Sequence, residues 1–367
     1  MKKLLSMISG EKIQPGETLI LFDEIQECPE ALNTLKYFKE KANEYHVISV
    51  GSLLGTLLAQ PKSYPVGMVN LLDIFPLTFD EFLEAVDPTM YTYYDGIQKG
   101  QQIEEIFHSL LSEVCNYYFI IGGMPECVSS WIKYNDPAKI SQIQRELIEI
   151  YENDFSKHNG KINSGRILLV FRSIVAQLAK PNEKFMYGAV REGGRARDFE
   201  EAIEWLVSAG MLNRVYNVSK MEHHLSAFDR LDQFKRFVFD TGLLKHMAGI
   251  DNSAILLKSC YQFKGALTEN YILQQLQGQF EIAPRYYSDK NNESTSSSKT
   301  EPISFRWKRK PGKINLLPLS KDMLQKITLP QPYVFQNAAT GRMATSPILR
   351  CILYVRPEIY YKYIFLK

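Results

Sequence analysis

Cysteine is scarce in this sequence and poorly placed for cross-linking: five residues are scattered along 367 positions, and none forms a CxxC pair. This usage argues against a disulfide framework or a zinc site, and we expect reduced, mostly buried thiols. The six histidines show no metal-ligand spacing either. A protein that depends on a structural metal is therefore not indicated.

Long apolar runs and a strong net charge are also missing. No apolar stretch approaches membrane-spanning length, and the one at the N-terminus is broken by Ser6. We therefore expect no signal peptide, no membrane contact and a cytoplasmic protein. The net charge is only +2, so no overall field marks a nucleic-acid-binding protein, although a local basic patch can still bind nucleic acid.

What the sequence does contain is a short apolar run that ends in two carboxylates. Leu19–Phe22 is followed directly by Asp23 and Glu24. Such a run predicts a strand buried on both faces of a parallel sheet, whose sites lie at the carboxyl ends of the strands. This is the form of a Walker B element, in which Asp23 would hold Mg²⁺ through water and Glu24 would polarise a water attacking a γ-phosphate. Alternatively, the carboxylates cap the next helix or pair with a lysine.

A second strand is predicted shortly afterwards. Pro29 opens a helix from about Glu30 to Asn43, and residues 47–50 form another apolar run that ends at Gly51-Ser52. A strand, a crossover helix and a strand make a βαβ unit, so the two strands should be parallel with their polar ends on one edge. Ser52 would then sense a γ-phosphate, or Gly51-Ser52 simply caps a following helix.

Helices dominate the next part of the chain. Residues 69–74 are a third candidate strand, and Thr78 with Glu81 has capping-box spacing, which predicts a helix start. Gly122-Gly123-Met124-Pro125 should interrupt the helical pattern that follows. The helices expected here cover residues 97–118, 126–133 and 138–155.

The middle of the chain predicts three helices and then a strand, at residues 166–179, 185–192, 198–209 and 211–218. This is the layout of a winged helix. Three basic residues, Arg191, Arg195 and Arg197, lie at or just before the third helix, the one that would enter a DNA major groove. Contact with a protein, or plain solvation, is the more common role of such a cluster.

The last third changes in character. Residues 237–244 predict a strand followed by a helix, and residues 265–277 predict a further helix. Residues 289–300 are polar and of low complexity, and prolines recur without periodicity from Pro302 onward, so this tail shows no pattern of a packed core.

Taken together, these motifs resemble one family. The matching stretches are LILFDEIQECPEAL, VISVGSLLG, FPLTFDEFL, YYFIIGGMPECV, IYENDFSKH, the segment from AQLAK to the wing, FDTGLLKHMAG and KGALTENYILQQL, in this order between Leu19 and about Leu276. The chain is similar to the bacterial and archaeal AAA-type ATPases, in which a P-loop domain precedes a winged helix and a restriction-nuclease-like domain. The resemblance implies Asp23 as the Mg²⁺-associated acid, Glu24 as the catalytic glutamate, Ser52 at the sensor position and Glu269 as the first acid of the nuclease-like core.

The sequence also departs from that family. Nothing before Asp23 fits GxxxxGK[ST], so we expect an N-terminally truncated member without the loop that cradles phosphates. Met68 stands where the family tends to place a basic residue. The nuclease-like core has Ser304 where its acid belongs and no glutamate two residues before Lys321. Glu269 alone cannot hold a metal.

The sequence therefore predicts an α/β protein of several parts. These are an incomplete AAA-type P-loop parallel sheet (1–95), a helical and winged-helix region (96–225), the start of a nuclease-like α/β domain (226–288) and a degraded tail (289–367). The family uses ATP and Mg²⁺. We expect this chain to be an ATPase-family protein that binds ATP weakly or not at all. The alternative is a non-enzymatic winged-helix module whose partner is DNA or a protein.

Overall fold

A computed structural model of the protein describes residues 6–7, 10, 12–51, 67–97, 103–180, 184–219, 225–257, 263–279 and 284–286. For residues 29, 156–162 and 279 it describes the backbone alone. Ser52, Ser304, Lys321 and the tail 289–367 lie outside the described residues, as does the helix expected after Ser52.

The N-terminal unit has the predicted βαβ arrangement. Strands β1 (Leu19–Phe22) and β2 (His46–Ser49) pair in parallel, with Leu19 opposite His46. The crossover contains a short 3-10 turn, η1 (Ile25–Glu27), and helix α2 (Pro29–Lys41). Pro29 lies in the first turn of α2, where its missing N–H has no helical partner to lose. The parallel pair and its crossover helix are confirmed.

Burial of β1 differs from the prediction. Ile20 is 8% exposed, but Leu19 and Leu21 are 45% and 44% exposed, so β1 is not buried on both faces. The reason is that α2 covers one face of the β1–β2 pair. There Ile25, Leu32 and Leu35 pack with Phe22 and Val47. In the described part of the chain, no second layer covers the face that carries Leu19 and Leu21.

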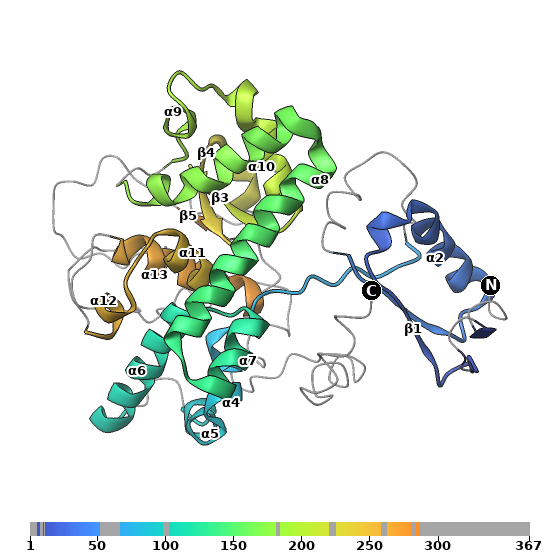
Figure 1. The fold of residues 1–367 in the computed structure, drawn as a ribbon, viewed down its shortest axis with the longest axis horizontal. Helices are drawn as coiled ribbons and strands as arrows, with labels where there is room; N and C mark the ends of the chain where they lie inside the picture. Colours follow the sequence, from blue (N-terminus) through green and yellow to red (C-terminus); the bar gives the residue numbers. More distant parts are fainter. Residues whose placement is uncertain are drawn as a thin grey trace.

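The predicted strand at 69–74 is wrong. Residues 70–78 have no regular secondary structure, and Leu71, Leu72 and Ile74 are 60%, 61% and 81% exposed. An apolar run becomes a strand only beside a partner strand, and among the described residues this run has none. The stretch leads from the N-terminal unit into the helical body (Figure 1).

The body begins with the predicted capping box. Helix α4 (Phe79–Val86) starts where the Thr78 N–H donates to Glu81 Oε2 at 2.8 Å and the Glu81 N–H donates to Thr78 Oγ1 at 3.4 Å. Helices α5 (Pro88–Asp95), α6 (Glu105–Ile121) and α7 (Pro125–Tyr134) follow. Helix α6 starts later than the expected residue 97, and Gly122, at φ 78°, separates α6 from α7 as predicted.

Helix α8 (Pro137–Leu178) covers two segments predicted as separate helices. It is not straight: Arg172 Nε donates to Glu152 Oε1 at 2.8 Å, whereas 20 residues of straight helix would separate them by about 30 Å. The rings of Phe155 and Phe171 also lie 5.4 Å apart. The chain therefore reverses direction within α8, and Figure 1 shows its ribbon turning back.

Short helices and a small three-stranded sheet complete the body. Helices α9 (Tyr187–Val190) and α10 (Ala196–Ser208) precede the antiparallel strands β3 (Leu212–Val218) and β4 (Asp229–Val238), with the 3-10 turn η2 (Leu225–Phe228) between the strands. Strand β5 (Arg285–Tyr286) pairs in parallel with β3, giving the order β4-β3-β5. The remaining helices are α11 (Thr241–Met247), α12 (Asn252–Leu256) and α13 (Lys264–Gln279).

One hydrophobic core runs through the body, from Phe79 in α4 to Leu267 in α13. It includes residues on both sides of the expected domain boundaries at 95/96 and 225/226, and the β3–β4 pairing crosses the second boundary. Within the described ranges, no helix is both long enough and apolar enough to span a membrane.

Candidate functional site

The structure puts Asp23 and Glu24 at the carboxyl end of β1, as predicted. The Val50 N–H donates to the Phe22 carbonyl at 2.8 Å, and the Ile25 N–H donates to the Val50 carbonyl at 3.0 Å, so the ends of β1 and β2 stay together. Both carboxylate residues are exposed at this edge. Ser52, predicted at the sensor position on the same edge, lies outside the described residues.

Local hydrogen bonds fix the shape of this edge. Glu24 adopts a left-handed backbone conformation at φ 48°, and its N–H donates to Asp23 Oδ1 at 3.0 Å. The Gln26 side-chain amide donates to the Glu24 carboxylate. Carboxylate oxygens suit Mg²⁺, but the described residues contain no group of three or more His, Cys, Asp or Glu side chains that could hold a metal. Any ion here would therefore need water or phosphate oxygens to complete its shell.

The three predicted arginines gather at the start of α10. Arg191, Arg195 and Arg197 are all exposed. The Arg195 N–H donates to the Asp198 carboxylate at 2.9 Å, which caps the helix. The Arg191 guanidinium lies 5.9 Å from the ring centre of Phe199. The structure thus shows three exposed arginines in this short stretch, and their proposed contact with DNA stays a prediction.

Glu269, which the resemblance matches to the first acid of a nuclease-like core, forms an ion pair in the structure. Its carboxylate pairs with Lys235 Nζ at 3.1 Å, which links α13 to β4. No second acid joins it in a metal-binding group among the described residues. In this structure Glu269 therefore supports packing of the helix on the hairpin.

Sequence reasoning missed a buried carboxylate at the centre of the body. Asp240 is fully buried, and it accepts hydrogen bonds from Gly123 N at 2.7 Å, Leu243 N at 2.9 Å and Gln274 Nε2 at 3.2 Å. Burial raises the pKa of Asp240, and these hydrogen bonds act in the opposite direction. Its place directly before a helix is the local signal that could have marked it as a capping residue.

The hydrogen bonds around Asp240 extend to four segments. Gln274 Nε2 also donates to the Tyr118 hydroxyl at 2.9 Å, and that hydroxyl donates to the Leu77 carbonyl at 2.5 Å. The Thr241 N–H and the Phe79 N–H donate to the side-chain oxygens of Gln274 and Gln275. The stretches FPLTFDEFL, YYFIIGGMPECV, FDTGLLKHMAG and KGALTENYILQQL therefore meet at one point. Much of the motif pattern in this part of the chain reflects a structural joint.

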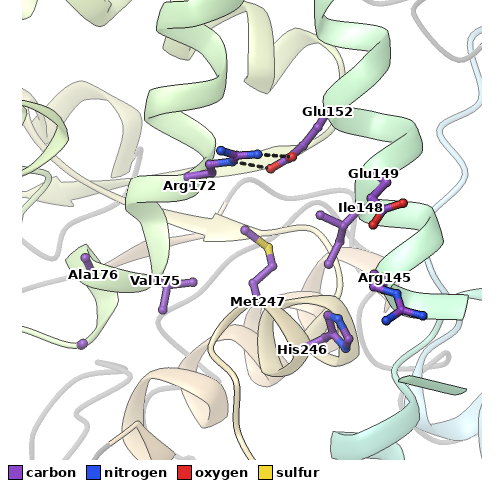
Figure 2. Close-up of a pocket in the computed structure, with 10 residues that line it drawn as sticks. Arg145, Ile148, Glu149, Glu152, Arg172, Val175, Ala176, His246 and Met247 are labelled. Carbon is purple, nitrogen blue, oxygen red and sulfur yellow. Dashed lines mark hydrogen bonds and ion pairs between the residues drawn. The ribbon is translucent and has the colours of Figure 1, made fainter. Parts of the chain in front are cut away.

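A groove of about 630 Å³ lies between the two halves of α8 and α11 (Figure 2). Its apolar lining includes Ile148, Val175 and Met247, and the Glu152–Arg172 ion pair crosses one end. Burial, together with the charges of Lys245 and Arg145, lowers the pKa of His246 at the other end. The residues that line this groove include none of those predicted from the sequence as functional. Both acidic and basic side chains line it, so its charge does not indicate one class of ligand.

Comparison with known families gives two matches. Residues 2–83 match the model of an AAA domain, and residues 112–254 match that of a domain of unknown function (DUF8612). A comparison with curated proteins gives no match. The first match contains β1, α2 and β2, and the second extends from within α6 into α12. The N-terminal part of the chain is therefore similar to an AAA-type, P-loop ATPase domain, as its motifs predict.

Proposed function

We propose that this chain is an AAA-type ATPase-family protein whose Asp23–Glu24 edge binds Mg·ATP weakly or not at all. The match of residues 2–83 supports the family, and the exposed acids at the end of β1 support the location of the site. Mg²⁺ in such a site neutralises phosphate charge. Asp23 would hold the ion through water, and Glu24 would orient a water.

The observation that carries weak binding is the charge at this edge. Asp23 and Glu24 are both exposed at this edge, and no stretch of the sequence fits GxxxxGK[ST]. A triphosphate would then meet two carboxylates without the backbone N–H groups and lysine that offset its charge. Such a site gains little from binding the nucleotide.

Thermal unfolding with and without Mg·ATP tests this proposal, using the wild type and the Asp23→Asn/Glu24→Gln variant. A ligand present at 100 times its Kd stabilises a protein by about 2.7 kcal/mol. We expect no saturable shift in the melting temperature of either protein at millimolar Mg·ATP. A shift in the wild type that the variant loses would contradict weak binding and show a working nucleotide site.

A second candidate function is binding of duplex DNA through a winged-helix-like unit. The order that favours it is the second half of α8, α9, α10 and then the β3–β4 hairpin. The three exposed arginines lie at the N-terminal end of α10, the helix that would enter the major groove. They would contact backbone phosphates, which gives affinity without sequence preference.

Fluorescence anisotropy with a labelled duplex tests the DNA-binding function. The Arg195→Ala/Arg197→Ala variant should bind more weakly, and the slope of log K against log salt should decrease by about 0.9 for each lost phosphate contact. The matched control is Lys36→Ala/Lys39→Ala, which removes two exposed positive charges from α2. Equal losses in both variants would point to a general charge effect and contradict a DNA-reading α10.

A further inference from the structure

Two arginines face each other across the β3–β4 hairpin. Arg214 on β3 is the register partner of Arg236 on β4. Like charges directly opposite one another in an antiparallel pair are unfavourable. Because side chains alternate along a strand, Tyr216 and Phe234 lie on the same face, and Phe234 belongs to the main core. The two guanidinium groups therefore lie on the side of the hairpin that packs into the body.

Arg236 is buried, and its guanidinium has no hydrogen-bonded counter-ion among the described residues. The residue is 3% exposed, and its Nε, Nη1 and Nη2 atoms have no hydrogen-bond partner among the described residues. Its guanidinium carbon lies 4.0 Å from the ring centre of Phe234. Burial, and to a lesser extent the charge of Arg214, lowers the pKa of Arg236 to about 8. A buried charge without a counter-ion is strongly destabilising, so this site calls for an anion.

The described carboxylates do not supply that anion. Glu204 on α10 pairs with Arg214, whose Nη1 also donates to the Tyr216 hydroxyl at 2.7 Å, while Arg214 Nε has no partner among the described residues. Glu200 lies one turn earlier on α10 and favours the charged form of Arg236, but it is exposed and forms no described ion pair with it. Of the two guanidinium groups, only that of Arg214 therefore has a paired carboxylate among the described residues.

We propose that Arg214 and Arg236 form an anion site at the hairpin for a phosphate group. A planar guanidinium offers parallel N–H donors that match two oxygens of one phosphate, and two such groups on one face can bind it from two sides. The phosphate can belong to a small molecule or to a DNA backbone. Binding of free phosphate requires neither proposed function, whereas binding of backbone phosphate rests on the DNA-binding function.

Thermal unfolding of the full chain in inorganic phosphate, against chloride at equal ionic strength, tests the site. We expect a saturable rise in the melting temperature of the wild type. Arg236→Met removes the buried charge and its donors, so phosphate binding should weaken by roughly ten- to a hundred-fold. In chloride this variant should be at least as stable as the wild type, because an uncompensated charge is gone.

Arg172→Met is the matched control, since Arg172 is an exposed arginine outside the hairpin. An equal phosphate shift in the wild type and both variants would be a general salt effect and would overturn the proposal. The proposal would also be overturned if Arg236→Met were less stable than the wild type in chloride and phosphate did not change the melting temperature of the wild type. The counter-ion of Arg236 would then lie within the chain. If Arg236→Met does not fold, Arg214→Met serves as the test variant. If phosphate raises the melting temperature of Arg214→Met as much as that of the wild type, the proposed site is wrong.

A short duplex distinguishes the two sources of phosphate. If Arg236→Met weakens duplex binding and free phosphate competes with the duplex, the site takes a backbone phosphate. If duplex binding is unchanged or absent while the phosphate shift is lost, the site takes a small phosphate ligand. In the second case the DNA-binding function can fail while the anion site stands.

Discussion

The carboxylate of Asp240 accepts a hydrogen bond of 2.7 Å from the backbone N–H of Gly123, a residue 117 positions earlier in the chain. This hydrogen bond holds the C-terminal end of α6 next to the N-terminal end of α11. The neighbouring Gly123 carbonyl accepts from the Leu77 N–H at 2.8 Å, so the stretch that arrives from the N-terminal unit is held at the same joint. The body is thus tied to its incoming connection by backbone groups and one buried acid.

Replacing Asp240 with Asn should destabilise the protein by about 1–3 kcal/mol. The asparagine has one acceptor oxygen, and its NH₂ group would face N–H donors that the carboxylate now satisfies. Chemical denaturation measures the change in the free energy of unfolding. Asp251→Asn is the control, because Asp251 is an exposed cap that accepts from Ser253 N, and Asn caps a helix about as well as Asp. Equal effects of the two substitutions would contradict a special role for Asp240.

Stability should also depend on pH through Asp240. Burial raises its pKa in the folded protein above its ordinary value of 3.8, so the folded state keeps a proton to higher pH than the unfolded state does. The contribution of this group to stability therefore falls as pH rises from 3.8 through the raised pKa, and is level above it. The measurement is the difference in unfolding free energy between the wild type and Asp240→Asn across weakly acidic pH. A difference independent of pH would show that the pKa is not raised.

Two glycine-to-alanine substitutions should change the stability of the protein in opposite directions. A Cβ at Gly242 would lie 2.5 Å from the Ile121 carbonyl oxygen, so Gly242→Ala should cost about 3 kcal/mol or more, because backbone would have to move. A Cβ at Gly165, within α8, would meet nothing within 4 Å, so Gly165→Ala should add roughly 0.5–1 kcal/mol. Chemical denaturation of both variants checks the pair. Tolerance of alanine at residue 242 would contradict the close approach of α6 and α11.

Local rules predicted part of this structure well. Apolar runs and Pro29 predicted β1, α2 and β2, and the helix between the two strands predicted their parallel pairing, which places Asp23 at the carboxyl edge of the sheet. Thr78 with Glu81 located the start of α4 because a capping box is complete within four residues. Gly122, which has a positive φ, and Pro125 likewise marked the boundary between α6 and α7.

Features that depend on distant neighbours could not be predicted in this way. The exposure of Leu19 and Leu21 depends on which layers cover the sheet, and the run at 69–74 is no strand because no described strand pairs with it. Asp240 reads locally as a cap, while its contact with Gly123 is set by tertiary packing. The burial of Arg236 did have a signal in the sequence, because alternation along a strand puts it on the same face as the apolar Phe234 and Val238.

Glu269 should behave as a structural ion-pair residue. Its carboxylate and Lys235 Nζ are 3.1 Å apart, and the side chains are 26% and 21% exposed. Glu269→Gln should therefore cost about 1 kcal/mol or less, and neither Mg²⁺ nor Mn²⁺ should change the melting temperature of the wild type. Lys235→Met tests the same pair from the other side and should have a similar small effect. A Mn²⁺-dependent shift in the wild type that Glu269→Gln abolishes would restore a metal-binding role.

The reversal of α8 should depend on its aromatic contact and little on its ion pair. Phe155 and Phe171 are 2% and 1% exposed with ring centres 5.4 Å apart, so Phe155→Ala should cost about 3–5 kcal/mol through lost burial and the cavity left behind. The Arg172 side chain is 61% exposed, and Arg172→Ala should cost at most about 1 kcal/mol because solvent screens its pairing with Glu152. Urea denaturation of the two variants measures both values. If Arg172→Ala proved as costly as Phe155→Ala, the charged clasp and not the packed rings would hold the two halves of α8 together.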